Sequence, residues 1–200
     1  MVGLFLVRHG QSTWNAESRW QGQADPPLTA LGEQQARAAA ERLATGAPID
    51  AIWASDLVRA RRTAELVAEH LGLSVQFDAR LRERDAGEWT GLTRPEIEER
   101  YPGALAARRS PPGFEQDEPL LARVVPALGA IAAGGAARVL VVTHGGIVRT
   151  VERDLGAPAE AVPNLGGRWV HADDGGPHAL GERLLLIDPD EVSVTVPRSI

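Results

Sequence analysis

The chain has 200 residues, a formal net charge of −6 and no cysteine, and these facts exclude several classes of protein. Its length is that of one ordinary domain, so we expect residues 1–200 to fold as a single unit without disulfides or a structural metal. The acidic balance argues against a nucleic-acid partner bound by a general basic surface. Without cysteine there is no thiolate nucleophile and no cysteine-based zinc site, as is typical of a reducing compartment.

The hydropathy pattern predicts a cytoplasmic protein with no membrane partner. The apolar start, residues 3–7, lacks a basic leader and is too short for a signal sequence, and no later segment approaches the roughly 18 apolar residues of a membrane span. All 21 basic residues are arginine, which we interpret as a coding preference, because arginines scattered over helical faces are usually solvated or paired. An anionic ligand therefore needs a local basic pocket.

Apolar runs alternate with helical patterns along most of the chain. Strands are predicted at residues 2–7, 51–54, 73–77 and 138–143, with late strands at 182–187 and 192–196 that pair antiparallel at an edge. Helices are predicted at 33–45, from a cap at Ser55 or Asp56 to Gly72, at about 120–133 with a kink or late start at Pro126, and after His144. This alternation predicts an α/β protein with a mostly parallel sheet covered on both faces.

The alternation breaks between residues 85 and 120, which are rich in glycine, proline and charged side chains. Only short helices are expected there. An irregular insertion in an α/β domain is more often a lid or a substrate-binding region than a second domain. We therefore predict a lid insertion at about residues 85–120.

Two predicted strands end in a histidine followed by glycine, in "FLVRHG" and "VLVVTHGG". Ligands bind beyond the carboxyl ends of strands in open α/β sheets, so we expect His9 and His144 to lie at the same edge. Gly10 and Gly145 allow close backbone approach and leave amide N–H groups at a helix start, where anions bind well. Two capped core histidines are the alternative, and their twin placement argues against it.

Two arginines and a carboxylate are expected at the same edge. Arg8 ends the first strand, and Arg59 lies near the start of the helix after the second strand. Each guanidinium can hold a phosphate with two hydrogen bonds. Glu83 follows the third strand and could carry a proton to a leaving oxygen. Asp85 and Glu88 compete with it for that role.

Five sequence blocks, in order and over roughly residues 1–156, resemble the histidine phosphatase superfamily, also called phosphoglycerate-mutase-like. The blocks are "RHGQSTWN", "GQADPPLTALG", "SDLVRARRTAE", "LRERDAGEWTG" and "VVTHGG". The resemblance implies a three-layer α/β/α sandwich in which His9 becomes a phosphohistidine and Glu83 is the proton donor. It implies that the phosphate lies between Arg8, Arg59 and His144, and that the pocket is closed by Asn15, Gln21, Gly22 and Gly145.

The chemistry agrees with these residue types. A neutral imidazole, with a reference pKa of about 6.5, is a usable nucleophile near pH 7. Phosphoryl transfer otherwise needs mainly positioning and electrostatic stabilisation of the phosphate oxygens. Because arginines take the place of magnesium, we expect no metal and no other cofactor.

Sequence departures from the mutases favour a phosphatase acting on a small phosphate ester. Cofactor-dependent mutases have glutamate where this chain has Gln11, and they are longer. The segment "ALAARRSPPGF" nevertheless resembles the mutase segment that grips a substrate carboxylate, so Arg108 and Arg109 are candidate substrate ligands or, alternatively, solvated arginines on an exposed lid helix. A mutase and a non-catalytic phosphate-binding protein remain alternatives, and a homodimer remains open.

Overall fold

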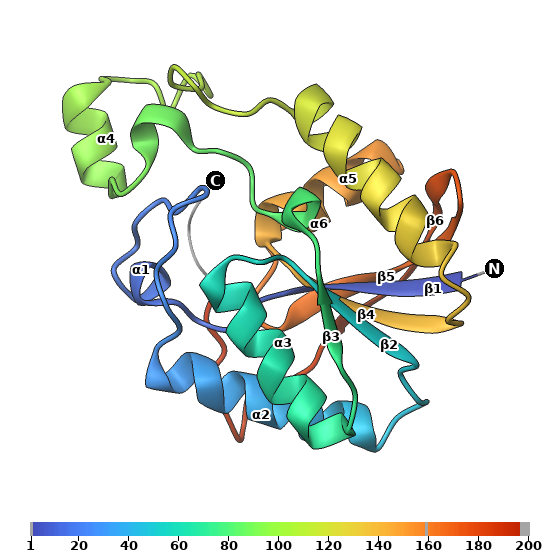
Figure 1. Cartoon of the computed structure of the whole chain (residues 1–200). Coiled ribbons are helices and arrows are strands. Elements are labelled where there is room, and N and C mark those ends of the chain that lie inside the picture. The colour runs from blue at the N-terminus through green and yellow to red at the C-terminus, as the bar shows by residue number, and fades with distance from the viewer. Residues whose placement is uncertain (1, 159, 197–200) are drawn as a thin grey trace.

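The computed structural model describes residues 2–158 and 160–196 and contains a mixed six-stranded sheet (Figure 1). The strand order is β3-β2-β4-β1-β5-β6. The neighbours among the first four are parallel, namely β3 (Val75–Phe77), β2 (Ala51–Ala54), β4 (Arg138–Thr143) and β1 (Val2–Arg8). The last two run antiparallel to their neighbours, namely β5 (Gly166–Asp173) and β6 (Gly176–Leu185). The predicted α/β class is confirmed.

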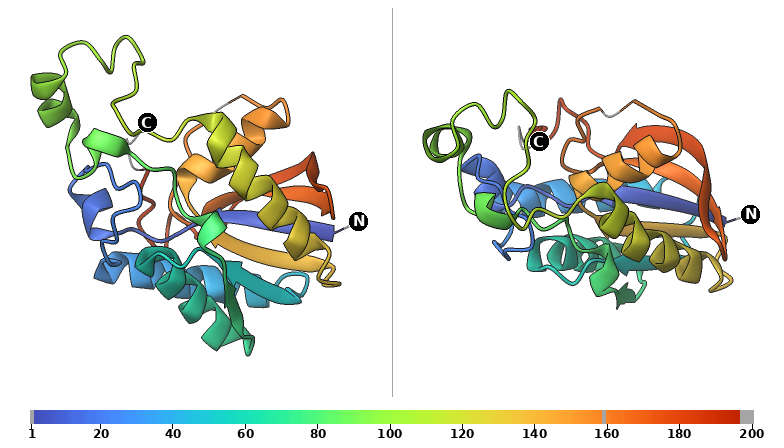
Figure 2. Two further views of the ribbon diagram at one scale, coloured as in Figure 1. Left: turned by 45° about the horizontal axis from the view of Figure 1, so that its top comes forward. Right: turned by 90° about the horizontal axis from the view of Figure 1, so that it is seen from above.

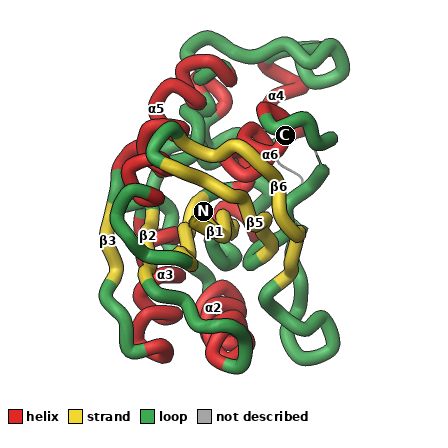
Figure 3. The backbone as a smooth tube through the Cα atoms, turned by 90° about the vertical axis from the view of Figure 1, so that its right-hand side faces the viewer, coloured by secondary structure: helices red, strands yellow, loops and turns green. Residues whose placement is uncertain are grey.

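Helices cover both faces of the sheet (Figures 1 and 3). One face carries α2 (Ala30–Ala44) and α3 (Val58–Leu71), and the other carries α5 (Asp117–Ala132) and α6 (Gly145–Asp154). The central strand β1 serves both layers, because successive side chains of a strand point to opposite faces. Leu4 and Leu6 belong to the core beneath α5 and α6, whereas Phe5 and Val7 belong to the core beneath α2 and α3. The uninterrupted apolar run of β1 follows from this burial on two sides.

The late part of the sheet differs from the prediction. The sequence predicts an antiparallel edge formed by late strands at 182–187 and 192–196, whereas the antiparallel strands of the structure are β5 and β6, joined in a hairpin. The strand predicted at 182–187 overlaps the end of β6, which begins at Gly176 and ends at Leu185. The strand predicted at 192–196 is wrong: these residues form a loop in which Thr195 accepts a backbone hydrogen bond from Asn164. Alternating apolar residues there meet no neighbouring strand with which to form a ladder.

Two helix starts also differ from the prediction, because the capping group is not the expected one. α2 begins at Ala30 rather than at residue 33, since the Thr29 hydroxyl accepts the N–H of Gly32. The caps expected for α3 at Ser55 or Asp56 are wrong. Asp25, from a distant loop, accepts the first free N–H of α3 instead. The predicted stop at Gly72 is confirmed by its left-handed backbone, with φ of 67°.

The helix α5 begins at Asp117 and continues through Pro126 to Ala132. The helix therefore begins three residues before the predicted residue 120, and a late start at Pro126 is wrong. Two acidic residues, Asp117 and Glu118, occupy the first turn, where carboxylates interact favourably with the helix dipole. Buried Val124 and other side chains hold the helix against the sheet across the proline.

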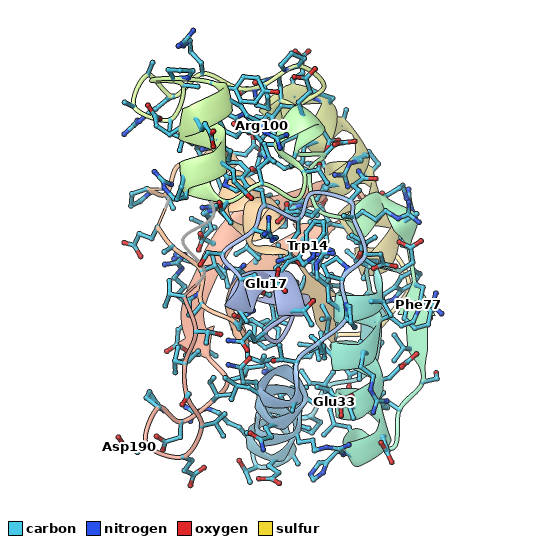
Figure 4. All side chains as sticks on the ribbon, turned by 90° about the vertical axis from the view of Figure 1, so that its left-hand side faces the viewer. Trp14, Glu17, Glu33, Phe77, Arg100 and Asp190 are labelled. Atoms are coloured by element: carbon cyan, nitrogen blue, oxygen red, sulfur yellow. The ribbon has the colours of Figure 1, made fainter. Side chains whose placement is uncertain are left out.

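Residues 85–116 contain the short 3-10 helix Gly87–Trp89 and α4 (Arg94–Arg100), as the sequence predicts. This segment extends beyond the end of the sheet (Figure 2). It has an apolar cluster of its own, formed with Trp20: Trp20, Ala86, Trp89, Leu92, Ile97 and Ala104. Figure 4 shows Arg100 of α4 and Glu33 of α2 toward opposite ends of the molecule, with Trp14 of α1 (Thr13–Ala16) between them. No helix among the described residues is long and apolar enough to cross a membrane.

Candidate active site

The parallel register brings the two histidines together at the carboxyl edge of the sheet. Arg8 at the end of β1 pairs with Thr143 at the end of β4, and the backbone N–H of His9 donates to the Thr143 carbonyl at 3.0 Å. The rings of His9 and His144 lie edge to face with centroids 5.2 Å apart. The expectation that both imidazoles lie at one edge is confirmed.

Hydrogen bonds fix the tautomer of His9. Its Nδ1 lies 2.6 Å from the Gly10 carbonyl oxygen, which can only accept, so Nδ1 carries the proton. Its Nε2 lies 3.2 Å from the Nε of Arg59, which can only donate, so Nε2 carries a lone pair. Nε2 is therefore the unprotonated ring nitrogen of His9.

The charge environment keeps both histidines neutral near pH 7. Burial, followed by the positive charges of Arg59 and Arg8, lowers the pKa of His9 well below its ordinary value of 6.5. Burial and the charge of Arg59 also lower the pKa of His144 well below 6.5. A neutral imidazole with an unprotonated ring nitrogen is a nucleophile, whereas an imidazolium is not.

Arg8 and Arg59 are held in place by backbone carbonyl groups. Arg8 donates to the Val162 carbonyl at 2.7 Å. Arg59 donates to the carbonyl groups of Ala24 and Gly22 at 2.7 and 2.9 Å. Burial is the main cause that lowers the pKa of Arg8 to about 9 and that of Arg59 to about 10. Both guanidinium groups remain charged at pH 7, so they supply fixed positive charge beside His9.

Glu83 is held by two backbone N–H groups. Its Oε1 accepts from Arg84 at 2.8 Å, and its Oε2 accepts from Gly146, near the start of α6, at 2.9 Å. A Cβ atom at Gly146 would lie 2.2 Å from the Glu83 Oε1. The glycine therefore makes room for the carboxylate at the helix N-terminus, where the helix dipole favours negative charge.

These residues surround a small cavity of about 40 Å³. Seven of its lining residues were predicted from the sequence: Arg8, His9, Gln21, Gly22, Arg59, Glu83 and Gly145. Five others complete the lining: Trp20, Arg84, Ala86, Gly146 and Arg149. Four of the twelve are arginines and one is a carboxylate. The cavity therefore suits a small anion.

Two predicted site residues, Asn15 and His144, lie behind the cavity. The side-chain oxygen of Asn15 accepts the backbone N–H of Ser12 at 3.2 Å, in a reciprocal cap of α1. His144 is fully buried, and its Nε2 lies 2.9 Å from the Ser55 hydroxyl. The Nδ1 of His144 is buried and makes no hydrogen bond within the described part of the chain.

A larger groove of about 680 Å³ continues outward from the cavity. The cavity and the groove share Trp20, Arg84, Gly146 and Arg149. Arg108 and Arg109 line this groove only and are exposed. The groove has the size of an ordinary small-molecule site.

Sequence reasoning missed Arg84, Arg149 and the positioning contact of Ser55. Arg84 follows the predicted Glu83, and its side chain donates to Asp117 and Thr150 at 2.8 and 2.7 Å. Arg149 lies four residues after Gly145, so helix periodicity would have placed it on the same face of α6. No local pattern signals that Ser55 contacts His144, because this contact joins the ends of two different strands.

The comparisons with known proteins decide the family. The model of the histidine phosphatase superfamily (branch 1) matches residues 4–176. The chain belongs to the histidine phosphatase superfamily. The resemblance of its five sequence blocks is thereby confirmed.

Relatives within the histidine phosphatase superfamily include named phosphatases. Glucosyl-3-phosphoglycerate phosphatase of Mycolicibacterium vanbaalenii is 36% identical over 98% of this chain and 97% of its own length. The Mycobacterium tuberculosis protein of that name is 40% identical, over 82% of this chain and 80% of its own. A solved structure of the mycobacterial glucosyl-3-phosphoglycerate phosphatase with VO3 covers 86% of this chain and 93% of its own, with a TM-score of 0.78 and 35% identity. A probable phosphoglycerate mutase of Citrobacter koseri is 56% identical, over only 44% of this chain and 40% of its own.

Proposed function

We propose that the protein is a phosphomonoesterase that hydrolyses a small phosphorylated metabolite through a phosphohistidine on His9. The observation that carries this proposal is the state of His9, whose neutral ring directs an unprotonated Nε2 toward Arg59 at 3.2 Å. The positive side chains around it can bind a phosphate without making the histidine itself cationic. A phosphatase among the similar proteins over nearly the full length of the chain supports the same reaction.

In the first step the lone pair of His9 Nε2 attacks phosphorus, and the bond between phosphorus and the ester oxygen breaks. Glu83 gives a proton to the departing alkoxide, so a neutral alcohol leaves. In the second step a water molecule attacks the phosphohistidine and Glu83 takes its proton. The phosphorus–nitrogen bond then breaks, which releases phosphate, restores neutral His9 and returns to Glu83 the proton given in the first step.

The phosphate would be held by charge rather than by a metal. Arg8 and Arg59 can donate to its equatorial oxygens, and Gly145 offers a backbone N–H at the start of α6. The buried Nδ1 of His144 lacks a hydrogen-bond partner among the described residues, which supports a phosphate oxygen as its partner. Gln21 and Gly22 also line the cavity. Asn15 acts through the cap of α1, which positions the segment after His9.

We propose an acidic phosphate ester as the substrate. The outer groove has room for a substituent beyond the phosphate, and it is rich in arginine. Arg108 and Arg109 are candidate ligands for that substituent. The names of the phosphatases in the comparison point to a glycosylated phosphoglycerate. A phosphorylated metabolite as substrate supports the prediction of a cytoplasmic enzyme. Mutase activity is the second candidate, supported by the partial match to a probable phosphoglycerate mutase.

Brief exposure to 32P-labelled substrate tests the mechanism, because a phosphoramidate on histidine is labile in acid and stable in base. We expect such a label on the parent protein and none on His9→Ala. The same two proteins are assayed with p-nitrophenyl phosphate, which a purely phosphate-binding protein would not hydrolyse. Full turnover by His9→Ala would contradict the assignment of the nucleophile. Isomerisation of 3-phosphoglycerate without phosphate release would favour the mutase.

A further inference from the structure

The outer groove concentrates positive charge on a chain that is acidic as a whole. Its lining contains six arginines, namely Arg84, Arg94, Arg108, Arg109, Arg149 and Arg153. Among the described residues, the acidic side chains that line it are those of Asp117 and Glu160. The net charge of the whole chain is −6. A groove of this sign attracts an anionic group, since low-dielectric walls of one charge focus the local field.

The arginines of the groove differ in their distance from the reaction centre. Arg149 lines both the groove and the small cavity that contains His9, whereas Arg108 and Arg109 line only the groove. Arg149 is also among the positive charges that lower the pKa of Arg8. It therefore lies at the junction between the phosphate and the rest of a bound substrate.

Arg149 reaches this junction because of the geometry of α6. It follows Gly145 by four residues and Gly146 by three, so its side chain stands on the face that begins beside the cavity. Thr150 and Arg153 continue this face along the groove. Because Gly145 and Gly146 have no side chains, nothing on this face of α6 lies between Arg149 and the cavity.

Arg84 and Arg153, which also line the groove, share the carboxylate of Asp117. Asp117 accepts from Arg84 at 2.8 Å and lies 2.8 Å from the Nη2 of Arg153. Glu83, which lies across the cavity, raises the pKa of Arg149, but burial is the larger effect and lowers it.

We propose that Arg149, at the junction of cavity and groove, is the specificity residue for a carboxylate close to the phosphate ester of the substrate, and that the lid arginines contact only more distant groups. This inference rests on the phosphatase activity proposed above. The planar guanidinium matches a carboxylate, with which it can form two charge-assisted hydrogen bonds. The competing assignment gives the same carboxylate to Arg108 and Arg109.

Two substrates that differ in one group provide the test. 3-Phosphoglycerate and glycerol 3-phosphate share the carbon skeleton and the position of the phosphate, but only the first has a carboxylate. We measure phosphate release from each with the parent, Arg149→Gln, Arg149→Lys, Arg153→Gln and the double variant Arg108→Ala/Arg109→Ala. The quantity of interest is the ratio of kcat/KM for the acidic ester to kcat/KM for the neutral one.

The parent is expected to favour 3-phosphoglycerate by about ten-fold or more, which is the size of one charge-assisted hydrogen bond. Arg149→Gln should remove most of this preference, chiefly through KM, and Arg149→Lys should restore part of it. Arg153→Gln and the lid double variant should retain it.

Three results would overturn the inference. They are a parent with no preference, an equal loss on both esters in Arg149→Gln, and a preference that disappears only in the lid double variant. An equal loss would indicate that Arg149 binds the phosphate or positions Glu83. A parent that releases phosphate from neither ester nor from p-nitrophenyl phosphate would instead contradict the proposed function. Circular dichroism of each variant shows whether it is folded.

Discussion

Glu83 has its carboxylate fixed by the backbone N–H groups of Arg84 and Gly146, so substituting it tests one chemical role. We expect Glu83→Gln to slow hydrolysis of an alkyl phosphate by about 10²–10⁴-fold, because an alkoxide needs a proton to leave. p-Nitrophenyl phosphate should be much less affected, since nitrophenolate leaves readily without a proton. Steady-state kcat on both substrates measures the difference. Equal losses would indicate that Glu83 binds phosphate or supports the structure.

The buried histidines predict how stability depends on pH. His9 and His144 have pKa values well below 6.5 in the folded protein, whereas an unfolded histidine has a pKa near 6.5. Below pH 6.5 the unfolded chain therefore binds more protons, and protonation favours unfolding. The free energy of unfolding should be constant above about pH 7 and decrease below pH 6.5, by at most about 1.4 kcal/mol per pH unit for each histidine.

Urea denaturation between pH 8 and 5.5 measures this dependence in a range where most carboxylates stay ionised. His9→Asn should show about half of the slope, because one of the two titrating groups is gone. A free energy of unfolding that does not change over this range would show that the two histidines take up protons in the folded state.

At the residue scale the sequence predicts those site residues that lie in a repeated motif or in one of the five ordered blocks. His9 and His144 stand out because two buried strands end in the same dipeptide, and Arg59 and Glu83 follow from their order in the five blocks. No motif marks Arg149. From sequence alone, an arginine inside a helix is interpreted as a solvated surface residue, because the cavity beside it is not known. The contacts that place Asn15 behind the cavity are likewise set by packing.

The junction of β4 and α6 positions both a histidine and a carboxylate, so it is the element most sensitive to a small change. Gly146→Ala would bring a Cβ atom within 2.2 Å of the Glu83 carboxylate, which must then move. We expect the loss of activity on an alkyl phosphate to resemble that of Glu83→Gln. The free energy of unfolding should change little, because the displaced atom is the end of a side chain and alanine favours helix.

Gly72→Ala is the matched control for this prediction. Gly72 ends α3 in the left-handed region with φ of 67°, and no atom of the described residues lies within 4 Å of the added Cβ. Strain there should lower the free energy of unfolding by roughly 1 kcal/mol without changing kcat. Thermal unfolding and activity are measured for both variants. A Gly146→Ala protein with parental activity would show that Glu83 does not depend on this junction.

At the scale of elements the sequence predicts the parallel core well and the later strands poorly. β2 coincides with its predicted range, because its short apolar run is bounded by polar residues. The loop at 192–196 has the alternation of a strand, but strand formation depends on a partner that local sequence does not show. The start of α3 depends on Asp25, which lies more than thirty positions away in the chain. Distant contacts of this kind explain the misplaced boundaries.

At the scale of the whole molecule, the apolar cores around the sheet are distinct from the charged cavity and groove beyond the carboxyl ends of the parallel strands. Two apolar cores on either side of the sheet hold β1 and β4 in register, and a third apolar cluster holds the segment beyond the sheet. Trp20 belongs to this third cluster and also lines the cavity. A movement of residues 85–116, or a substitution in their apolar cluster, would therefore change the wall of the cavity that Trp20 forms.

The positive charge of the cavity comes from Arg8, Arg59, Arg84 and Arg149, so neither binding of an anion nor turnover should need a divalent ion. We expect full activity in EDTA and inhibition by vanadate, which can adopt the five-coordinate geometry of the transition state beside His9. A ligand at 100 times its Kd stabilises the folded state by about 2.7 kcal/mol, so vanadate should raise Tm by roughly 5–10 °C in a chain of this length. The variant Arg108→Ala/Arg109→Ala should retain this shift, because vanadate carries no second acidic group. Activity that EDTA abolished and one divalent ion restored would assign part of the charge to a metal.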